Sequence, residues 1–164
     1  MEKHNATKDA IEIYTAQGFL DLYNIKHGTN FEIKEQRDAP DIHCKNTDGK
    51  DLFIEITLTQ DYEGDAPVML GQKTERIPHK FTSMKDEVVE NLKTALCEKL
   101  KKDYGNSVAL VIRDISGVDW DWNLELPSIN YWLRSLPLKN PYDMGIWIIN
   151  NDKTKIYRID KLET

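Results

Sequence analysis

Apolar positions recur at helical spacing in two stretches of the chain. In residues 7–25 they form one apolar face, made of Ile11, Phe19, Leu22 and Tyr23. Gly18 lies inside this stretch and weakens a helix by about 1 kcal/mol relative to alanine. In residues 84–103 the stripe is longer, and Gly105 is suited to follow the end of a helix; its members are Met84, Val88, Leu92, Ala95, Leu96 and Leu100. The pattern predicts two amphipathic helices.

Between these helices the apolar residues alternate with polar ones, which is typical of strands that bury one face. A short strand is expected at residues 31–34, followed by strands at residues 41–46 and 50–59 that are joined by Thr47-Asp48-Gly49. A two-residue turn would mix apolar and polar faces across the pair. A three-residue loop with Gly49 in the left-handed conformation keeps the faces separate, because it pairs Ile42 with Ile54. The same register sets Asp41 opposite Glu55.

The C-terminal half begins with a continuous apolar run at residues 107–113, which indicates a buried strand. Strand, helix and buried strand in this order predict a right-handed parallel crossover. Residues 60–83 lack periodicity, and residues 114–140 are irregular apart from one short helix expected at residues 129–136. Residues 145–150 and 155–160 have the pattern of a terminal hairpin. We therefore predict one α/β domain over residues 1–164, with a core at about 7–113 and a C-terminal β-hairpin extension within 114–164.

Composition supports a single globular domain. The chain has 164 residues, of which 40% are hydrophobic and 30% charged, and this balance is that of a folded domain. No apolar run approaches the roughly 18 residues that a membrane span needs, and the first residues lack the apolar segment of a secretion signal. We expect a cytoplasmic protein in which Cys44 and Cys97 stay reduced, since their spacing matches neither a zinc motif nor a redox motif.

Charge is unevenly distributed. The net charge of −6 counts against nonspecific binding to duplex nucleic acid, which depends on clustered lysine and arginine. Residues 73–102, however, contain eight basic and five acidic residues. A local basic strip on an acidic body is compatible with nucleic acid as a partner, and it leaves a homodimer or a protein partner open.

Two acidic residues carry a recognisable motif. Pro40-Asp41 precedes the hairpin and Glu55-Ile56-Thr57 follows in its second strand. Together with the order of elements, this motif resembles the PD-(D/E)XK nuclease superfamily over about residues 7–113. The resemblance implies a restriction-endonuclease-like αβββαβ core, a mixed sheet flanked by helices. It also implies that Asp41 and Glu55 bind Mg²⁺ or Mn²⁺ for phosphodiester hydrolysis. Thr57 departs from the motif, because the family has a lysine at this position.

Three further residues fit the resemblance. Lys85 and Lys99 both fall inside the apolar arc of the second helix, and in the superfamily such a helix lysine can replace the missing one. A crossover helix begins near the end of the preceding strand, so Lys85 is expected nearer to Thr57 and Lys99 at the far end. Glu12 lies in the apolar face of the first helix, where the family often places an accessory acid. In the alternative reading, the lysine stems cover apolar surface and Glu12 reaches water from the edge of the stripe.

Two functions follow from these observations. The first is a metal-dependent nuclease with Asp41 and Glu55 as metal ligands and a helix lysine as charge stabiliser. The second is an inactive nuclease-like fold that acts as a protein-binding, inhibitor, immunity or regulatory module, which the acidic net charge and Thr57 favour. A third reading is a plain structural α/β domain that acts within a larger complex. For Glu55 itself, the alternative is a place on the solvated face of an ordinary amphipathic strand. His43 shares a strand face with Asp41 and is either a ligand or an ordinary surface histidine.

Overall fold

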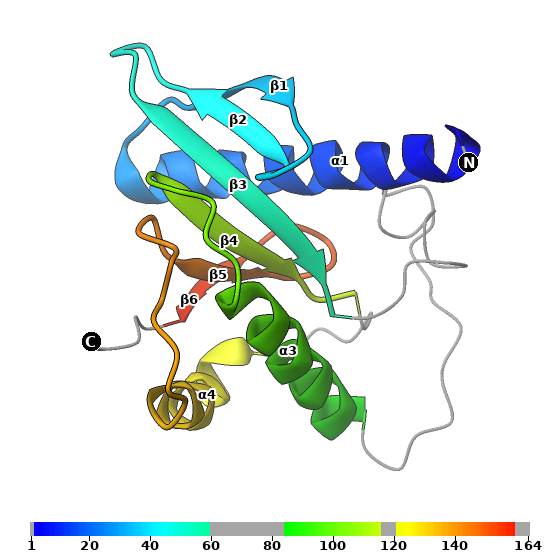
Figure 1. Cartoon of the computed structure of the whole chain (residues 1–164), viewed down its shortest axis with the longest axis vertical. Helices are drawn as coiled ribbons and strands as arrows, with labels where there is room; N and C mark the ends of the chain where they lie inside the picture. The colour runs from blue at the N-terminus through cyan, green and yellow to red at the C-terminus, as the bar shows by residue number, and fades with distance from the viewer. Residues whose placement is uncertain (1, 60–83, 116–120, 160–164) are drawn as a thin grey trace.

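The computed structural model describes residues 2–59, 84–115 and 121–159, with only the backbone of residues 2–6, 84 and 85. The N-terminal part contains α1 (Glu2–His27), β1 (Glu32–Gln36), β2 (Ile42–Lys45) and β3 (Asp51–Leu58). The remainder contains α3 (Met84–Leu100), β4 (Val108–Arg113), the 3₁₀ helix η1 (Trp122–Leu124), α4 (Leu126–Arg134), β5 (Ile146–Ile149) and β6 (Ile156–Ile159) (Figure 1). The predicted order of elements is therefore found.

The strands form one mixed, open sheet of six strands whose spatial order equals their order along the chain. β1, β2 and β3 pair antiparallel, and β5 and β6 do the same at the other edge. In the centre, β3, β4 and β5 run parallel. The class is therefore α/β, as predicted.

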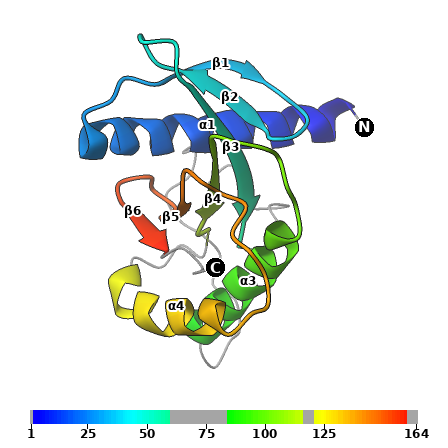
Figure 2. The ribbon, with the colours of Figure 1, turned by 60° about the vertical axis from the view of Figure 1, so that its left-hand side comes forward.

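The helices cover the two faces of this sheet, α1 on one side and α3 and α4 on the other (Figure 2). Strand β4 shows the alternation that this arrangement requires. Its residues Ala109 and Val111 pack in the cluster that contains α1, whereas Leu110 and Ile112 pack in the cluster that contains α3 and α4. All six residues of β4 are buried, because both of its faces are covered.

The hairpin register agrees with the prediction from face alternation. Ile42 pairs with Ile54 and Cys44 with Leu52, and these four side chains are fully buried against α1. Gly49 has a φ of +82°, the left-handed conformation that the three-residue loop requires. This register brings the start of β2 beside the middle of β3, where Asp41 and Glu55 lie.

Two helix starts and one strand pairing differ from the prediction. Helix α1 begins at Glu2, because alanine, lysine and glutamate favour a helix even where no apolar face is formed. Helix α4 begins at Leu126, with a proline in its first turn, where the fixed φ of proline suits a helix start. Strand β5 pairs parallel with β4, so the terminal hairpin continues the central sheet and is not an appendage to it.

Two further predictions concern the cysteines and membrane-spanning helices. Cys44 is buried, Cys97 is partly buried, and both are free thiols. Among the described residues, no helix combines the length and apolarity that a membrane span requires.

Candidate functional site

The hairpin brings Asp41 and Glu55 together through hydrogen bonds that cross the strands. The main-chain N–H of Asp41 donates to Glu55 Oε1 (3.3 Å), and the N–H of Ile56 donates to Asp41 Oδ2 (2.8 Å). Asp41 is 6% exposed and Glu55 is 3% exposed. Each carboxylate is thus held by the backbone of the other strand, away from most solvent.

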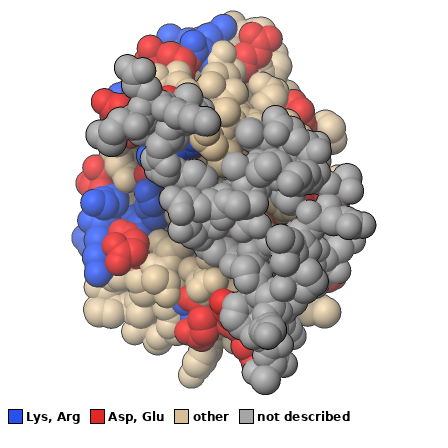
Figure 3. Space-filling view, turned by 90° about the vertical axis from the view of Figure 1, so that its right-hand side faces the viewer, with Lys and Arg blue, Asp and Glu red and all other residues tan. Residues whose placement is uncertain are grey.

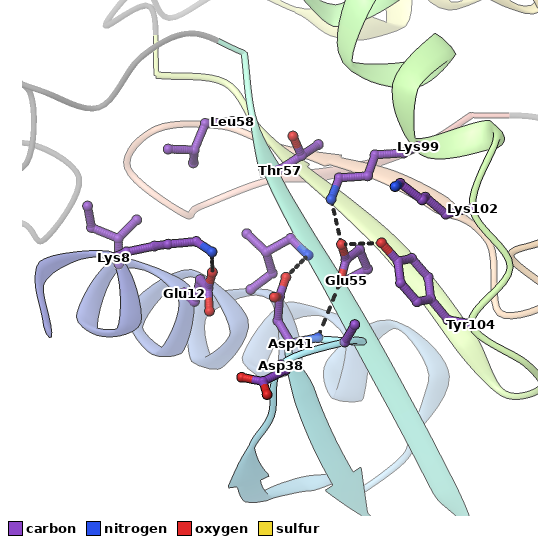
Figure 4. A pocket seen from close by; sticks show the side chains of 13 residues that line it. Lys8, Glu12, Asp38, Asp41, Glu55, Thr57, Leu58, Lys99, Lys102 and Tyr104 are labelled. Atoms are coloured by element: carbon purple, nitrogen blue, oxygen red, sulfur yellow. Dashed lines mark hydrogen bonds and ion pairs between the residues drawn. The ribbon is translucent and has the colours of Figure 1, made fainter. Parts of the chain in front are cut away.

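Glu55 also receives two donors from the chain that follows β3. Lys99 Nζ, near the end of α3, lies 2.5 Å from Glu55 Oε2, and the Tyr104 hydroxyl donates to the same oxygen at 2.8 Å (Figure 4). The Tyr142 hydroxyl in turn donates to the main-chain oxygen of Lys99 (2.6 Å). The carboxylate of Glu55 is therefore neutralised and oriented by side chains of α3 and of the loop that follows α3.

The surroundings of Asp41 disfavour its charge. Burial, followed by the nearby charge of Glu55, raises the pKa of Asp41 to about 8, against the backbone hydrogen bond from Ile56, which lowers it. Burial and the hydrogen bond to Glu55 also raise the pKa of Tyr104, so its hydroxyl keeps its proton. Two buried carboxylates of this kind repel each other when both are ionised, and a proton or a cation relieves the repulsion.

Glu12 of α1 lines a cavity that Asp41 and Glu55 also line, and it lies on the side of Asp41 (Figure 4). Gln36 Nε2 donates to its Oε2 (3.1 Å), and Lys8 Nζ lies 3.4 Å from its Oε1. The Glu12 side chain is 8% exposed, and burial raises its pKa. Glu12 is therefore a buried member of the site, which contradicts the reading that it reaches water from the edge of the helix stripe.

These residues share one cavity of about 580 Å³. Its lining includes the predicted residues Glu12, Asp41, Glu55, Thr57 and Lys99, together with Tyr104. Lys8 and Lys102 add positive charge and Asp38 adds negative charge at its walls. The side chain of Lys85 lies outside the described residues. The site residues selected from the sequence thus converge, wherever their side chains are described.

Lys99 lies at the far end of α3, as expected, but the expectation that this end lies away from the site is wrong, because Lys99 contacts Glu55. Residues 60–83 separate β3 from α3, so the end of β3 does not fix where the helix begins. Its other end is fixed, because α3 leads into β4, where Val108 pairs with Phe53. Phe53 lies two positions before Glu55, and the last turn of α3 is therefore held beside Glu55.

Some residues of the site gave no usable signal in the sequence. Tyr104 follows the helix in a loop, where periodicity says nothing about direction. His43, in contrast, had a signal but does not line the cavity. Its ring stacks on Phe53 with centroids 4.6 Å apart, and its Nε2 lies 2.8 Å from Asp51 Oδ1.

The donor set suits a hard divalent cation. Magnesium is commonly held by one or two carboxylates together with water and substrate phosphate, and Asp41 and Glu55 supply that number. In the part of the chain that the structure describes, no group of three or more histidine, cysteine, aspartate or glutamate side chains is arranged to hold a metal. A closed site made of protein ligands alone, as for structural zinc, is not formed by the described residues.

Comparisons with protein-family models, with curated proteins and with solved structures found no match to this chain. Fold and geometry therefore define the protein as an α/β domain with a buried carboxylate pair and an adjoining lysine.

Proposed function

We propose that the chain is a Mg²⁺- or Mn²⁺-dependent hydrolase of phosphodiester bonds in nucleic acid, with a restriction-endonuclease-like core. The observation that carries the proposal is the placement of Asp41, Glu55 and Lys99 in one cavity, with Lys99 directly on Glu55. Two carboxylates and an ammonium are the groups that the PD-(D/E)XK motif uses, and here the ammonium comes from α3 instead of position 57.

Each group has a role that its surroundings support. Asp41 and Glu55 would hold the cation, which as a Lewis acid would polarise a phosphoryl oxygen and make water a better nucleophile. Lys99 would stabilise the negative charge that develops on the phosphate. Glu12, through Gln36 and Lys8, would keep a polar wall opposite Glu55 and orient water there. Thr57 lines the cavity without an ionisable group.

Three lysines at the cavity offer contacts to an anionic substrate, although four acids line the cavity as well and the net charge of the chain is −6. Lys8, Lys99 and Lys102 line the cavity. Figure 3 shows a face with one group of basic side chains at mid-height and another near the top, both with acidic side chains beside them. The three lysines would contact a phosphate at the cavity, whereas the net negative charge of the chain would limit nonspecific binding along a duplex.

The test is cleavage of labelled DNA and RNA, single- and double-stranded, with Mg²⁺, Mn²⁺ or EDTA. Asp41→Asn and Glu55→Gln keep the shapes of the side chains and remove the charges that would hold the cation. We expect each substitution to lower cleavage by at least about a hundredfold. Asp51→Asn is the matched control, because Asp51 is an exposed acid of β3, the strand of Glu55, and does not line the cavity. This variant should cleave like the parent chain.

Cleavage that persists in EDTA, or that Glu55→Gln leaves unchanged, would contradict the proposal. Absence of both cleavage and Mn²⁺ binding would favour the second function, a nuclease-like fold that binds a protein partner. The position of Lys99 is relevant to that outcome too, because its ion pair neutralises one of the two carboxylates.

A further inference from the structure

Three donors surround the Glu55 carboxylate within the described residues. The Asp41 N–H is on Oε1, and the Lys99 ammonium and the Tyr104 hydroxyl are both on Oε2. An ionised carboxylate has about four acceptor positions. One acceptor position is left on Oε1, whereas both positions on Oε2 are filled, so a divalent cation bound by Oε2 or by both oxygens requires that a donor leaves.

The three donors differ in their freedom to move. The Asp41 N–H belongs to the backbone and is fixed by the hairpin pairing that begins at Ile42. Tyr104 is held between Glu55 and the neighbouring Tyr142, with ring centroids 6.5 Å apart. Lys99 has a long flexible stem, its side chain is 23% exposed, and it lines the open cavity. Lys99 is thus the donor that can leave without a change in the backbone.

We propose that Lys99 is an internal counter-ion of Glu55 that an incoming divalent cation displaces, while Tyr104 keeps the carboxylate in position. This inference rests on the proposed function and describes how that site is regulated. The cation replaces the ammonium as the partner of Glu55, so the buried charge is never left unpaired. The released ammonium stays tethered at the cavity wall, where it becomes available to a phosphate. The Lys99 ammonium is therefore free to stabilise charge on a phosphate only when the metal is bound.

The experiment measures Mn²⁺ binding by calorimetry at one pH and ionic strength, without nucleic acid. Lys99→Met keeps the stem and removes the competing ammonium, so we expect it to tighten Mn²⁺ binding about tenfold. Lys102→Met is the matched control for the general effect of removing a positive charge at the same cavity, and it should tighten binding less than about threefold. Tyr104→Phe should not tighten binding, because Tyr104 is the donor that stays.

Two of the outcomes separate this inference from the proposed function, and two would overturn both. If the parent chain binds Mn²⁺ and Lys99→Met binds it no more tightly than Lys102→Met, the displacement is refuted while a metal site remains. If only Lys99→Met binds Mn²⁺, Lys99 is a counter-ion that the metal cannot displace in the parent chain; the displacement and the nuclease proposal both fail. If Tyr104→Phe tightens binding as much as Lys99→Met, the assignment of the departing donor is wrong. If no variant binds Mn²⁺, both ideas fail.

Discussion

The surroundings of Asp41 in the folded chain strongly disfavour its ionised form. Its pKa of about 8 compares with an ordinary value of 3.8, with burial as the first cause and the charge of Glu55 as the second. Below about pH 3.8 the group is protonated in the folded and the unfolded chain alike. Between this value and about 8 the unfolded chain has lost the proton that the folded chain keeps. The contribution of Asp41 to stability is therefore lost as the pH rises through this window.

Asp41→Asn removes this titration and keeps an oxygen that can accept the Ile56 N–H. We expect the free energy of unfolding of the variant, relative to the parent chain, to rise between pH 5 and about pH 8 in metal-free buffer and to level off above it. Urea unfolding of both proteins at several pH values measures the difference, and the other titrating groups largely cancel in it. Parallel pH profiles for the two proteins would show that Asp41 is ionised throughout.

At the residue scale, the proximity of two residues could be predicted from the sequence where a short hairpin joins them. Asp41 and Glu55 are joined by a hairpin whose register follows from Gly49 and the apolar face, so their proximity could be predicted. Lys99 and Tyr104 reach Glu55 across separations of 44 and 49 residues. No local pattern encodes the angle at which α3 crosses the sheet, and the choice between Lys85 and Lys99 could not be made from periodicity.

Helix α1 illustrates a conflict between helix propensity and packing at the scale of an element. A β-carbon built on Gly18 would lie 2.6 Å from Cδ and 2.9 Å from Cβ of Lys153. Lys153 has a φ of +57°, and its Nζ lies 3.5 Å from the centroid of the Tyr14 ring. The glycine that weakens the isolated helix is thus where α1 meets the turn between β5 and β6.

Gly18→Ala should therefore lower the free energy of unfolding by about 1 kcal/mol, since overpacking of about 1–3 kcal/mol outweighs a gain in helix propensity of about 1 kcal/mol. In a Lys153→Gly background the contact is gone, and the same substitution should become stabilising. Chemical denaturation of the four proteins of this double-mutant cycle gives both values. An equal effect in the two backgrounds would mean that Lys153 does not limit the position.

The arrangement of the whole sheet was only partly predictable. The β3–α3–β4 crossover followed from the order of strand, helix and buried strand. The second crossover, through η1 and α4 to β5, was hidden because residues 114–140 show one short helix among irregular sequence. The apolar run of β5 could therefore be recognised as a strand, but its parallel partner could not, and the hairpin was taken for an extension of the domain.

The strand order also has a consequence for folding kinetics. Neighbours in the sheet are neighbours along the chain, but the loops between them differ in length. Pairing of β2 with β3 closes a short loop. The contacts of α3 and β4 with β3 close long loops, at a greater entropic cost. We expect the carboxylate pair to form early and its lysine to arrive late. Ile42→Val should then mainly slow folding, and Tyr142→Phe, which releases the end of α3, should mainly speed unfolding. Stopped-flow folding and unfolding rates test this order. If Ile42→Val mainly sped unfolding and Tyr142→Phe mainly slowed folding, the reverse order would hold. In the expected order, Glu55 lies beside Asp41 before its counter-ion is present, so the site is neutralised only once the long-range contacts of α3 have formed.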